Sequence, residues 1–301
     1  MAMRLRGTGG GKGPPERLSM LKTGIFFHYQ NGDRLRDFPE ALGDVLSRDN
    51  VFLYDAFYPL KPASSFDLDA VPIELVTRVH SPRMIDEVRR SGAFEGALLS
   101  ASGTVAAAIR IWNGEIDNAF VFTGYGDHHA GRDFYGGGCY LNGAAIAIQE
   151  LRSRFAASRF AIIDTDAHHG DGTWDIFEND PGVLYVCFCS GPSREHNNKV
   201  NVQLPWRLTD EDYLGLVKKS LHPRVKAFRP EVIFWNWGYD GTRGEYGDLG
   251  LSPDLHVRLA EELKGLAGEV CRSRLIVVLC GGSRRDLARL LIPNVIRVLT
   301  A

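Results

Sequence analysis

Short apolar runs alternate with longer, helix-like segments over most of the chain. Five runs of four to six residues are rich in β-branched and aromatic side chains and lack polar alternation, which is typical of parallel strands covered on both faces. They are Ala119–Phe122, Phe160–Ile163, Val183–Phe188, Val232–Trp235 and Leu275–Leu279. The pattern predicts an α/β fold, a single three-layer domain in which a mostly parallel sheet has helices on both faces.

The segments between these runs have helical character. Ala97–Trp112 is rich in Ala and Ile, and Asn142–Ser153 carries apolar residues at helical spacing. Thr209 is an N-cap residue for a helix over Asp210–Phe228, and Pro253 predicts the start of another, because proline is favoured in the first helical turn. We find no internal repeat and no linker after residue 20.

The first 19 residues are basic and rich in Gly and Pro, and they lack the apolar segment of a secretory signal. We therefore predict a disordered tail over residues 1–19 and a folded domain over residues 20–301. No stretch approaches the ~20 apolar residues that span a bilayer, so we expect no membrane association. The formal net charge of -2 provides no overall attraction to nucleic acid, and we predict no direct nucleic-acid binding.

The chain has five cysteines and no CxxC pair. An odd number without such a pair disfavours a disulfide framework and indicates a reducing compartment, so we predict a cytoplasmic protein. Cys187 and Cys189 lie on one predicted strand, and we expect them to point to opposite faces and not to chelate one ion. Most of the cysteines are expected to be small buried apolar residues.

Unusual polar residues follow the C-terminal ends of four predicted strands. The sequence GDHH at 126–129 follows the first strand, and DTDAHH at 164–169 follows the second. GYD at 238–240 follows the fourth, and GGS at 281–283 follows the fifth. Ligands in open α/β sheets bind outside the carboxyl ends of the strands. We therefore expect these four loops to converge on one site.

Three residues of these loops have the type and spacing of metal ligands. Asp166 and His168 are two residues apart at a strand end and point the same way, and Asp240 adds a carboxylate from another strand. Two carboxylates, one imidazole and an open position suit a catalytic Zn²⁺. The oxygen ligands would also accept Fe²⁺, Mn²⁺ or Co²⁺. The alternative is a buried polar network that only specifies the core.

Two adjacent histidines, His128 and His129, have no place in that ligand set. One of them can act as general base on water activated by the metal, and the other as acid for the leaving amine. Asp164 and Asp171 are placed to orient the two rings, because a carboxylate on the far ring nitrogen fixes the tautomer and raises basicity.

These segments resemble the histone deacetylase and acetylpolyamine amidohydrolase family, which has the arginase-like fold. The resemblance is carried by GDHHAGRDFYGGGCYLNGAAIAI, IDTDAHHGDGTWDIF, GYDGTRGEYGDLGLS and LCGGS, in this order, and extends from about Gly24 to about Arg297. It implies a deacetylase-like catalytic domain over residues 20–301. It also implies that Asp166, His168 and Asp240 are the metal ligands.

The resemblance assigns roles to the histidine pair as well. It implies that His129 is the general base, and that Asp164 orients His128 while Asp171 orients His129. Gly137 would accept the amide N–H of the substrate at its backbone carbonyl.

The resemblance further implies a structural potassium ion near Asp164, Asp166 and His168. The family often has Ser-x-His where this chain reads Cys-Phe-Cys at 187–189. Cysteine is a poor potassium ligand, so this departure weakens the prediction of K⁺.

Two further departures concern the pocket. The family turn reads Gly-Gly-Tyr, and its tyrosine hydroxyl stabilises the oxyanion, but this chain has Ser283 there. Losing such a donor typically costs ~10²–10³ in rate. Tyr246, in the segment GYDGTRGEYGDLGLS that also contains Asp240, is a candidate for the missing hydroxyl. Gly138 replaces an aromatic residue of the family's acyl-lysine channel, which predicts a wider pocket.

The leading interpretation is a zinc-dependent hydrolase that cleaves an N-acyl amide, with a small acyl-amine or an acylated lysine as substrate. Two other interpretations remain open. Ser283 motivates a metal-bearing module that binds an acylated ligand with little or no turnover. Gly138 motivates a hydrolase for a longer acyl chain, an ester or a cyclic amide. The oligomeric state stays open.

Overall fold

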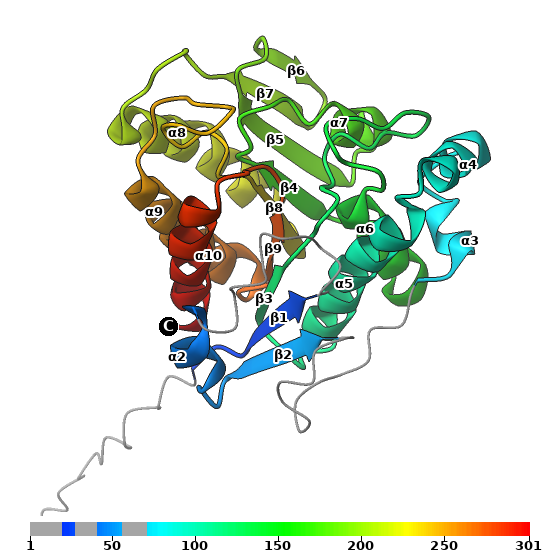
Figure 1. Cartoon of the computed structure of the whole chain (residues 1–301), viewed down its shortest axis with the longest axis horizontal. Helices are drawn as coiled ribbons and strands as arrows, with labels where there is room; N and C mark the ends of the chain where they lie inside the picture. Colours follow the sequence, from blue (N-terminus) through cyan, green and yellow to red (C-terminus); the bar gives the residue numbers. More distant parts are fainter. Residues whose placement is uncertain (1–19, 28–40, 56–70) are drawn as a thin grey trace, which may run out of the picture.

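The computed structural model describes residues 20–27, 41–55 and 71–301. These residues contain one nine-stranded sheet with the order β2-β1-β3-β9-β8-β4-β5-β7-β6 (Figure 1). All neighbouring strands are parallel except β6 and β7. The strands are β1 (Thr23–Phe27), β2 (Val51–Asp55), β3 (Asn118–Val121), β4 (Phe160–Asp164), β5 (Val183–Cys189), β6 (Arg194–His196), β7 (Lys199–Gln203), β8 (Val232–Trp237) and β9 (Leu275–Leu279). The predicted α/β fold with a mostly parallel sheet is confirmed.

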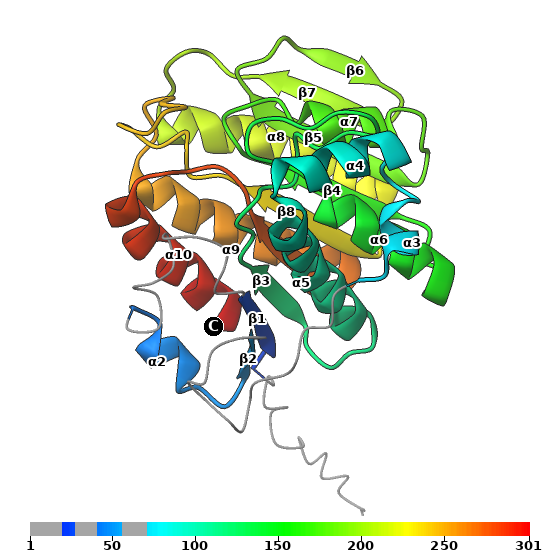
Figure 2. The same ribbon diagram turned by 45° about the vertical axis from the view of Figure 1, so that its right-hand side comes forward.

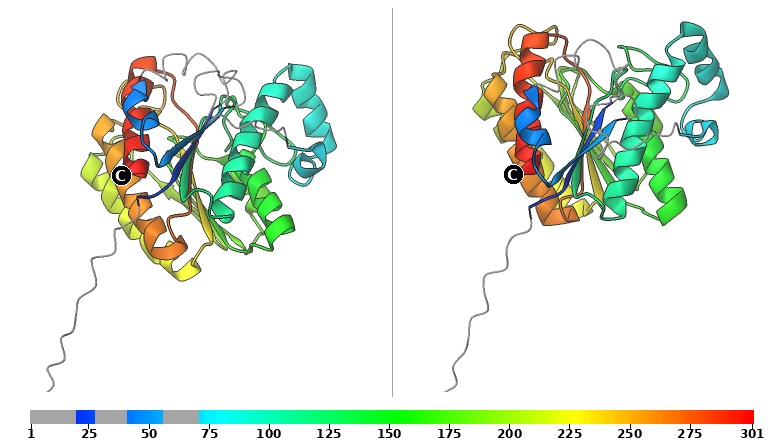
Figure 3. Two further views of the ribbon diagram at one scale, coloured as in Figure 1. Left: turned by 90° about the horizontal axis from the view of Figure 1, so that it is seen from below. Right: turned by 60° about the horizontal axis from the view of Figure 1, so that its bottom comes forward.

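The helices form two layers, one on each face of the sheet (Figure 3). One hydrophobic cluster lies between the sheet and α2, α8, α9 and α10, and the other lies between the sheet and α3 to α7. The helices are α2 (Gly43–Leu46), α3 (Ile73–Val76), α4 (Pro82–Ser91), α5 (Phe94–Trp112), α6 (Gly143–Phe155), α7 (Asp171–Phe177), α8 (Asp210–Phe228), α9 (Pro253–Cys271) and α10 (Arg285–Thr300). This arrangement confirms the predicted three layers.

The strands that were predicted from apolar runs are β3, β4, β5, β8 and β9, each buried along its whole length. Strands β1, β2, β6 and β7 were not predicted. The three residues of β6 are exposed, and β7 mixes apolar with polar positions, so neither has a continuous apolar run. Figure 2 shows β6 and β7 at one end of the sheet and β1 and β2 at the other.

The predicted helix starts are confirmed where capping chemistry marks them. The Thr209 side chain accepts a hydrogen bond from the Asp212 backbone N–H at 3.1 Å at the start of α8. Helix α9 begins at Pro253, as proline in the first turn predicted. Among the described residues, no single helix is long and apolar enough to span a membrane; α4 and α5 meet that composition only as a pair, and that pair is bent by 119°.

One expectation about the cysteines is wrong. Cys187 and Cys189 lie on the same face of β5, because side-chain direction alternates along a strand and residues two apart share a face. Both belong to the cluster beneath α3 to α7, whereas Val186 and Phe188 pack in the opposite cluster. The expectation of burial is confirmed, since all five cysteines are buried and free.

The topology places the predicted loops beside one another. Strands β3, β9, β8 and β4 are consecutive neighbours and parallel, so their carboxyl ends meet at one edge of the sheet. The loops that follow them are those that carry the His-His, Asp-x-His, Asp and Gly-Gly-Ser sequences. The predicted convergence on one site is therefore confirmed. The prediction of a disordered tail concerns residues 1–19, which lie outside the described residues.

Candidate active site

The three predicted metal ligands meet at the carboxyl edge of the sheet. His168 Nδ1 lies 3.1 Å from Asp166 Oδ1 and 2.8 Å from Asp240 Oδ2. One ligand atom from each residue lies within 4.8 Å of the other two. Because zinc lies roughly 2.0–2.2 Å from its oxygen and nitrogen ligands, atoms at these separations can share one ion.

The second carboxylate oxygens hold the ligands in place. Asp166 Oδ2 accepts a hydrogen bond from the Gly281 backbone N–H at 2.7 Å, and Asp240 Oδ1 accepts one from the Ala167 backbone N–H at 3.1 Å. The buried Asp240 Oδ2 lies close to His168 Nδ1, but no donor among the described residues makes a hydrogen bond of suitable geometry to it. A buried carboxylate oxygen without a donor is costly, and a metal ion between these ligands would satisfy it.

The electrostatics of the site favour a positive charge. Burial raises the pKa of Asp240 to about 7, and the neighbouring Asp166 charge adds to this effect. Burial opposes protonation of His128, but the charges of Asp164 and Asp166 outweigh it and raise the pKa of His128 to about 10. The hydrogen bond that the His168 ring donates to Asp166, together with the adjacent Asp240 carboxylate, raises the pKa of His168 to about 10. The residues present therefore fit a divalent cation.

Each predicted histidine–aspartate pair is brought together. His128 Nδ1 lies 3.0 Å from Asp164 Oδ2, and His129 Nδ1 lies 2.7 Å from Asp171 Oδ1. The two imidazole rings are 4.0 Å apart between centroids. His128 is 3% exposed and its Nε2 lies 3.8 Å from Asp166 Oδ1, whereas the His129 side chain is 20% exposed. His129 is thus the more exposed member of the pair.

Sequence reasoning missed two buried side chains that support this arrangement. The Tyr185 hydroxyl on β5 lies 2.9 Å from Asp164 Oδ2 and 3.2 Å from the Gly170 carbonyl oxygen. Asp127 Oδ2 accepts a hydrogen bond from the Ala144 backbone N–H at 2.9 Å. This bond connects the loop that carries His128 and His129 to the start of α6. In the sequence, Tyr185 lies in an apolar strand and has the appearance of a core aromatic.

Ser283 lies outside the pocket that these residues surround. Its Oγ donates a hydrogen bond to Glu245 Oε2 at 2.8 Å, and its backbone N–H donates to Glu245 Oε1 at 2.9 Å. Ser283 is exposed and is not among the residues that line the pocket. Glu245 therefore holds the turn at 281–283 and binds the serine hydroxyl.

Tyr246, the neighbour of Glu245, does line the pocket. Its ring stacks on His168 with 5.5 Å between centroids and an interplanar angle of 25°. Its hydroxyl accepts a hydrogen bond from the Gly282 backbone N–H at 3.0 Å. A Cβ atom at Gly281 would collide with Asp166 Oδ2 and would lie 2.9 Å from the Tyr246 hydroxyl, so this hydroxyl lies beside the ligands.

The pocket has a volume of about 180 Å³. Glycines form much of its wall, and a Cβ atom at Gly138 would meet no atom of the described residues within 4 Å. Burial raises the pKa of the lining thiols Cys139 and Cys280, which keeps both neutral and unreactive. The lining residues are Gly124, Gly126, His128, His129, Gly137, Gly138, Cys139, Asp166, His168, Tyr246, Cys280 and Gly281. A larger cavity of about 770 Å³ lies between α9 and α10 and contains none of these residues.

Comparison with known proteins finds relatives that are named as deacetylases. The chain is 33% identical over 205 residues to a "Probable deacetylase" of Archaeoglobus fulgidus, covering 64% of this chain and 57% of that protein. It is 29% identical over 216 residues to "Histone deacetylase HDA1" of Candida albicans, covering 64% of this chain and 26% of that protein. The chain thus spans less than two thirds of the length of these curated relatives.

Comparison with solved structures finds a similar fold. A crystal structure of the HDA15 HD domain is similar with a TM-score of 0.77 and 22% identity, covering 93% of this chain and 88% of that chain. A family model described as "Histone deacetylase domain" matches residues 55–299. Since this match extends over most of the chain and includes every ligand and histidine described above, the chain belongs to the histone deacetylase family.

Proposed function

We propose that this chain is a metal-dependent hydrolase that cleaves an N-acyl amide, with a small acyl-amine or an acylated lysine as substrate. The observation that carries the proposal is the placement of three ligand atoms within 4.8 Å of one another beside two His–Asp pairs, on one pocket. The names of the curated relatives, a probable deacetylase and a histone deacetylase, support the same reaction.

Asp166, His168 and Asp240 would hold the ion, for which Zn²⁺ is our first choice and Fe²⁺, Mn²⁺ or Co²⁺ the alternatives. When bound, such an ion polarises the acyl carbonyl and makes water a stronger nucleophile. His129, oriented by Asp171 and accessible from the pocket, takes the proton from the attacking water. His128 is held by the buried Asp164, and its protonated ring would give the proton that the leaving amine takes up.

Two further groups would position the substrate. Tyr246 extends its hydroxyl beside the ligands from a ring stacked on His168, and this hydroxyl would donate a hydrogen bond to the oxyanion. Gly137 adopts φ +56°, and a side chain there would collide with His129, so only glycine suits the position. Its carbonyl would accept the amide N–H of the substrate. A potassium ion near Asp164, Asp166 and His168 stays a prediction, as does the cytoplasmic location.

The first experiment tests metal binding and hydrolysis together. The purified protein is expected to bind a divalent metal at this site and to hydrolyse at least one member of a panel of acyl-lysine and acyl-polyamine amides. Asp240→Ala removes one of three ligands, so the ion is expected to be lost from the site with all measurable activity. Elemental analysis and product release measure the two effects.

Asp86→Ala is the matched control, because Asp86 is an exposed aspartate on α4. It should keep both metal and activity. Unchanged hydrolysis by Asp240→Ala would refute the proposed ligand set. A wild-type protein that holds metal but stays inert until Ser283→Tyr is introduced would favour the binding-module interpretation.

The open space at Gly138 favours an acyl group longer than acetyl. Gly138→Phe is expected to lower kcat/KM for long-chain acyl amides about 10-fold or more relative to acetyl amides, because a pocket discriminates by ~1–3 kcal/mol per methylene. Rates on a series of acyl-lysine amides of increasing chain length measure this change.

Gly138 has φ +79°, so any side chain there carries backbone strain. Gly138→Ala has the same strain without the bulk and is the control. If alanine and phenylalanine lower all rates equally, Gly138 does not determine acyl length.

A further inference from the structure

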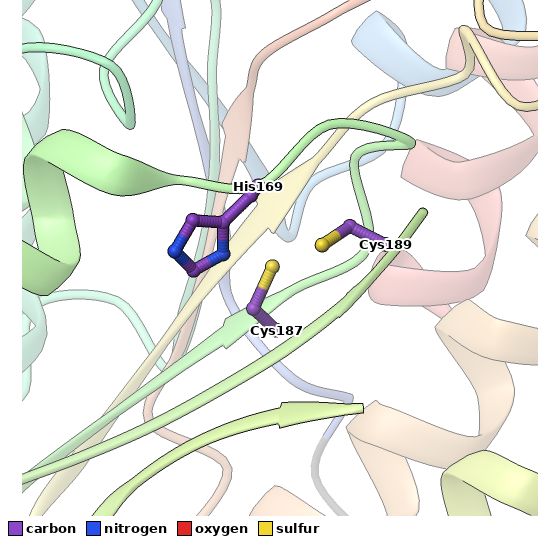
Figure 4. Close-up of side chains that lie close together, drawn as sticks. All are labelled: His169, Cys187 and Cys189. Atoms are coloured by element: carbon purple, nitrogen blue, oxygen red, sulfur yellow. The ribbon is translucent and has the colours of Figure 1, made fainter. Parts of the chain in front are cut away.

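A second cluster of ligand-type side chains lies next to the active-site loop. Cys187 and Cys189, at the carboxyl end of β5, share one face of the strand, and His169 comes from the loop after β4. One ligand atom from each of the three residues lies within 4.8 Å of the other two. Figure 4 shows the imidazole and the two thiols turned toward one another.

Asn201 on β7 adds a fourth polar atom to this cluster. Its Oδ1 lies 3.0 Å from Cys189 Sγ and 3.0 Å from His169 Nδ1. Its Nδ2 donates hydrogen bonds to the Gly191 carbonyl at 3.0 Å and the Pro192 carbonyl at 2.6 Å. These two bonds fix the amide so that the oxygen, and not the nitrogen, faces the thiols.

The cluster is shielded from water. Cys187 and Cys189 are fully buried, Asn201 is 3% exposed and His169 is partly buried. Two sulfurs, one imidazole nitrogen and one amide oxygen make a four-ligand set of the size that tetrahedral zinc requires. Thiolates select zinc over magnesium, calcium or potassium. Two thiolate charges would also balance a divalent ion, which makes burial of the charged group acceptable.

We propose that Cys187, Cys189 and His169, with Asn201 as the fourth ligand, form a second zinc site distinct from the one at Asp166, His168 and Asp240. The ligands are held by β5, β7 and the loop after β4, so a bound ion would connect three segments. Binding releases the two thiol protons to solvent. The role of this site is structural, and it does not depend on the hydrolysis proposed above.

The site would support the catalytic loop directly. His169 follows the ligand His168 in sequence, and Cys187 Sγ lies 3.9 Å from the His168 carbonyl oxygen. An ion held by His169 and the two thiolates would restrict the backbone that positions His168. The two metal sites therefore share one loop but use different ligand chemistry.

Cobalt substitution of the full chain tests the proposal, because thiolate ligands give Co²⁺ a sulfur-to-metal charge-transfer absorption in the near ultraviolet that carboxylate and imidazole ligands do not. Protein stripped with a chelator under reducing conditions is titrated with Co²⁺. We expect the wild type to bind about two equivalents and to show this band. Asp240→Ala should lose one equivalent and keep the band.

Cys189→Ser and His169→Gln are expected to lose the other equivalent and to weaken or abolish the band. Cys271→Ser is the matched control, since Cys271 is also buried and free but lies on α9, and it should behave as wild type. A wild type without the charge-transfer band overturns the proposal, and this result needs no variant to fold. A second result would also overturn it. In that case Cys187 and Cys189 form a disulfide in the wild type, so that two titratable thiols are missing until the protein is reduced, and the reduced protein still binds no second equivalent of Co²⁺.

Discussion

Replacing His129 with alanine is expected to lower kcat by about 10²–10⁴-fold, the usual contribution of a general base. The metal content should stay at the wild-type value, because His129 is not among the three ligands. The physical reason is the geometry of its ring: Nδ1 is bound to Asp171 at 2.7 Å, which leaves the other nitrogen for the attacking water. Steady-state kinetics on the best acyl amide and elemental analysis measure the two quantities.

The control for this variant is His196→Ala, which removes an exposed histidine on β6 outside the pocket. Its kinetics should equal those of the wild type. Asp171→Asn should reduce kcat less than His129→Ala, since it weakens only the orientation of the ring. If His129→Ala retained wild-type turnover with metal bound, the base would have to be another residue.

Tyr246→Phe is expected to lower kcat about 10²–10³-fold, which corresponds to ~3–4 kcal/mol of transition-state stabilisation. Phenylalanine keeps the ring that stacks on His168, so the variant removes the hydroxyl alone. Ser283→Ala should leave kcat close to the wild-type value, because the Ser283 hydroxyl is bound to Glu245 and Ser283 does not line the pocket. The two variants, compared under identical conditions, separate the candidates for the oxyanion donor.

Metal content and KM provide the checks on this comparison. Both variants should bind metal as the wild type does, and Tyr246→Phe should change kcat more than KM, since the bond to the oxyanion forms only in the transition state. The opposite pattern, with a large loss in Ser283→Ala and none in Tyr246→Phe, would refute the role of Tyr246.

Much of the fold and of the proposed metal site follows from local sequence. The central strands β3, β4, β5, β8 and β9 are continuous apolar runs, because a parallel strand covered on both faces has no polar positions. Strands β6 and β7, at one end of the sheet, have no continuous apolar run. They are recognised as strands only by their pairing with each other and with β5. Because parallel strands end at one edge, the polar residues after them could be predicted to meet.

The sequence by itself therefore determined the α/β class and predicted Asp166, His168 and Asp240 as candidate metal ligands. Only the tertiary structure decided which hydroxyl lies in the pocket, because Glu245 binds the turn at Ser283 through contacts between residues 38 positions apart. The tertiary structure also places His169 beside Cys187 and Cys189. The spacing of residues along one strand or helix predicts which face a side chain occupies. Which other residues that side chain contacts depends on how separate segments of the chain pack together.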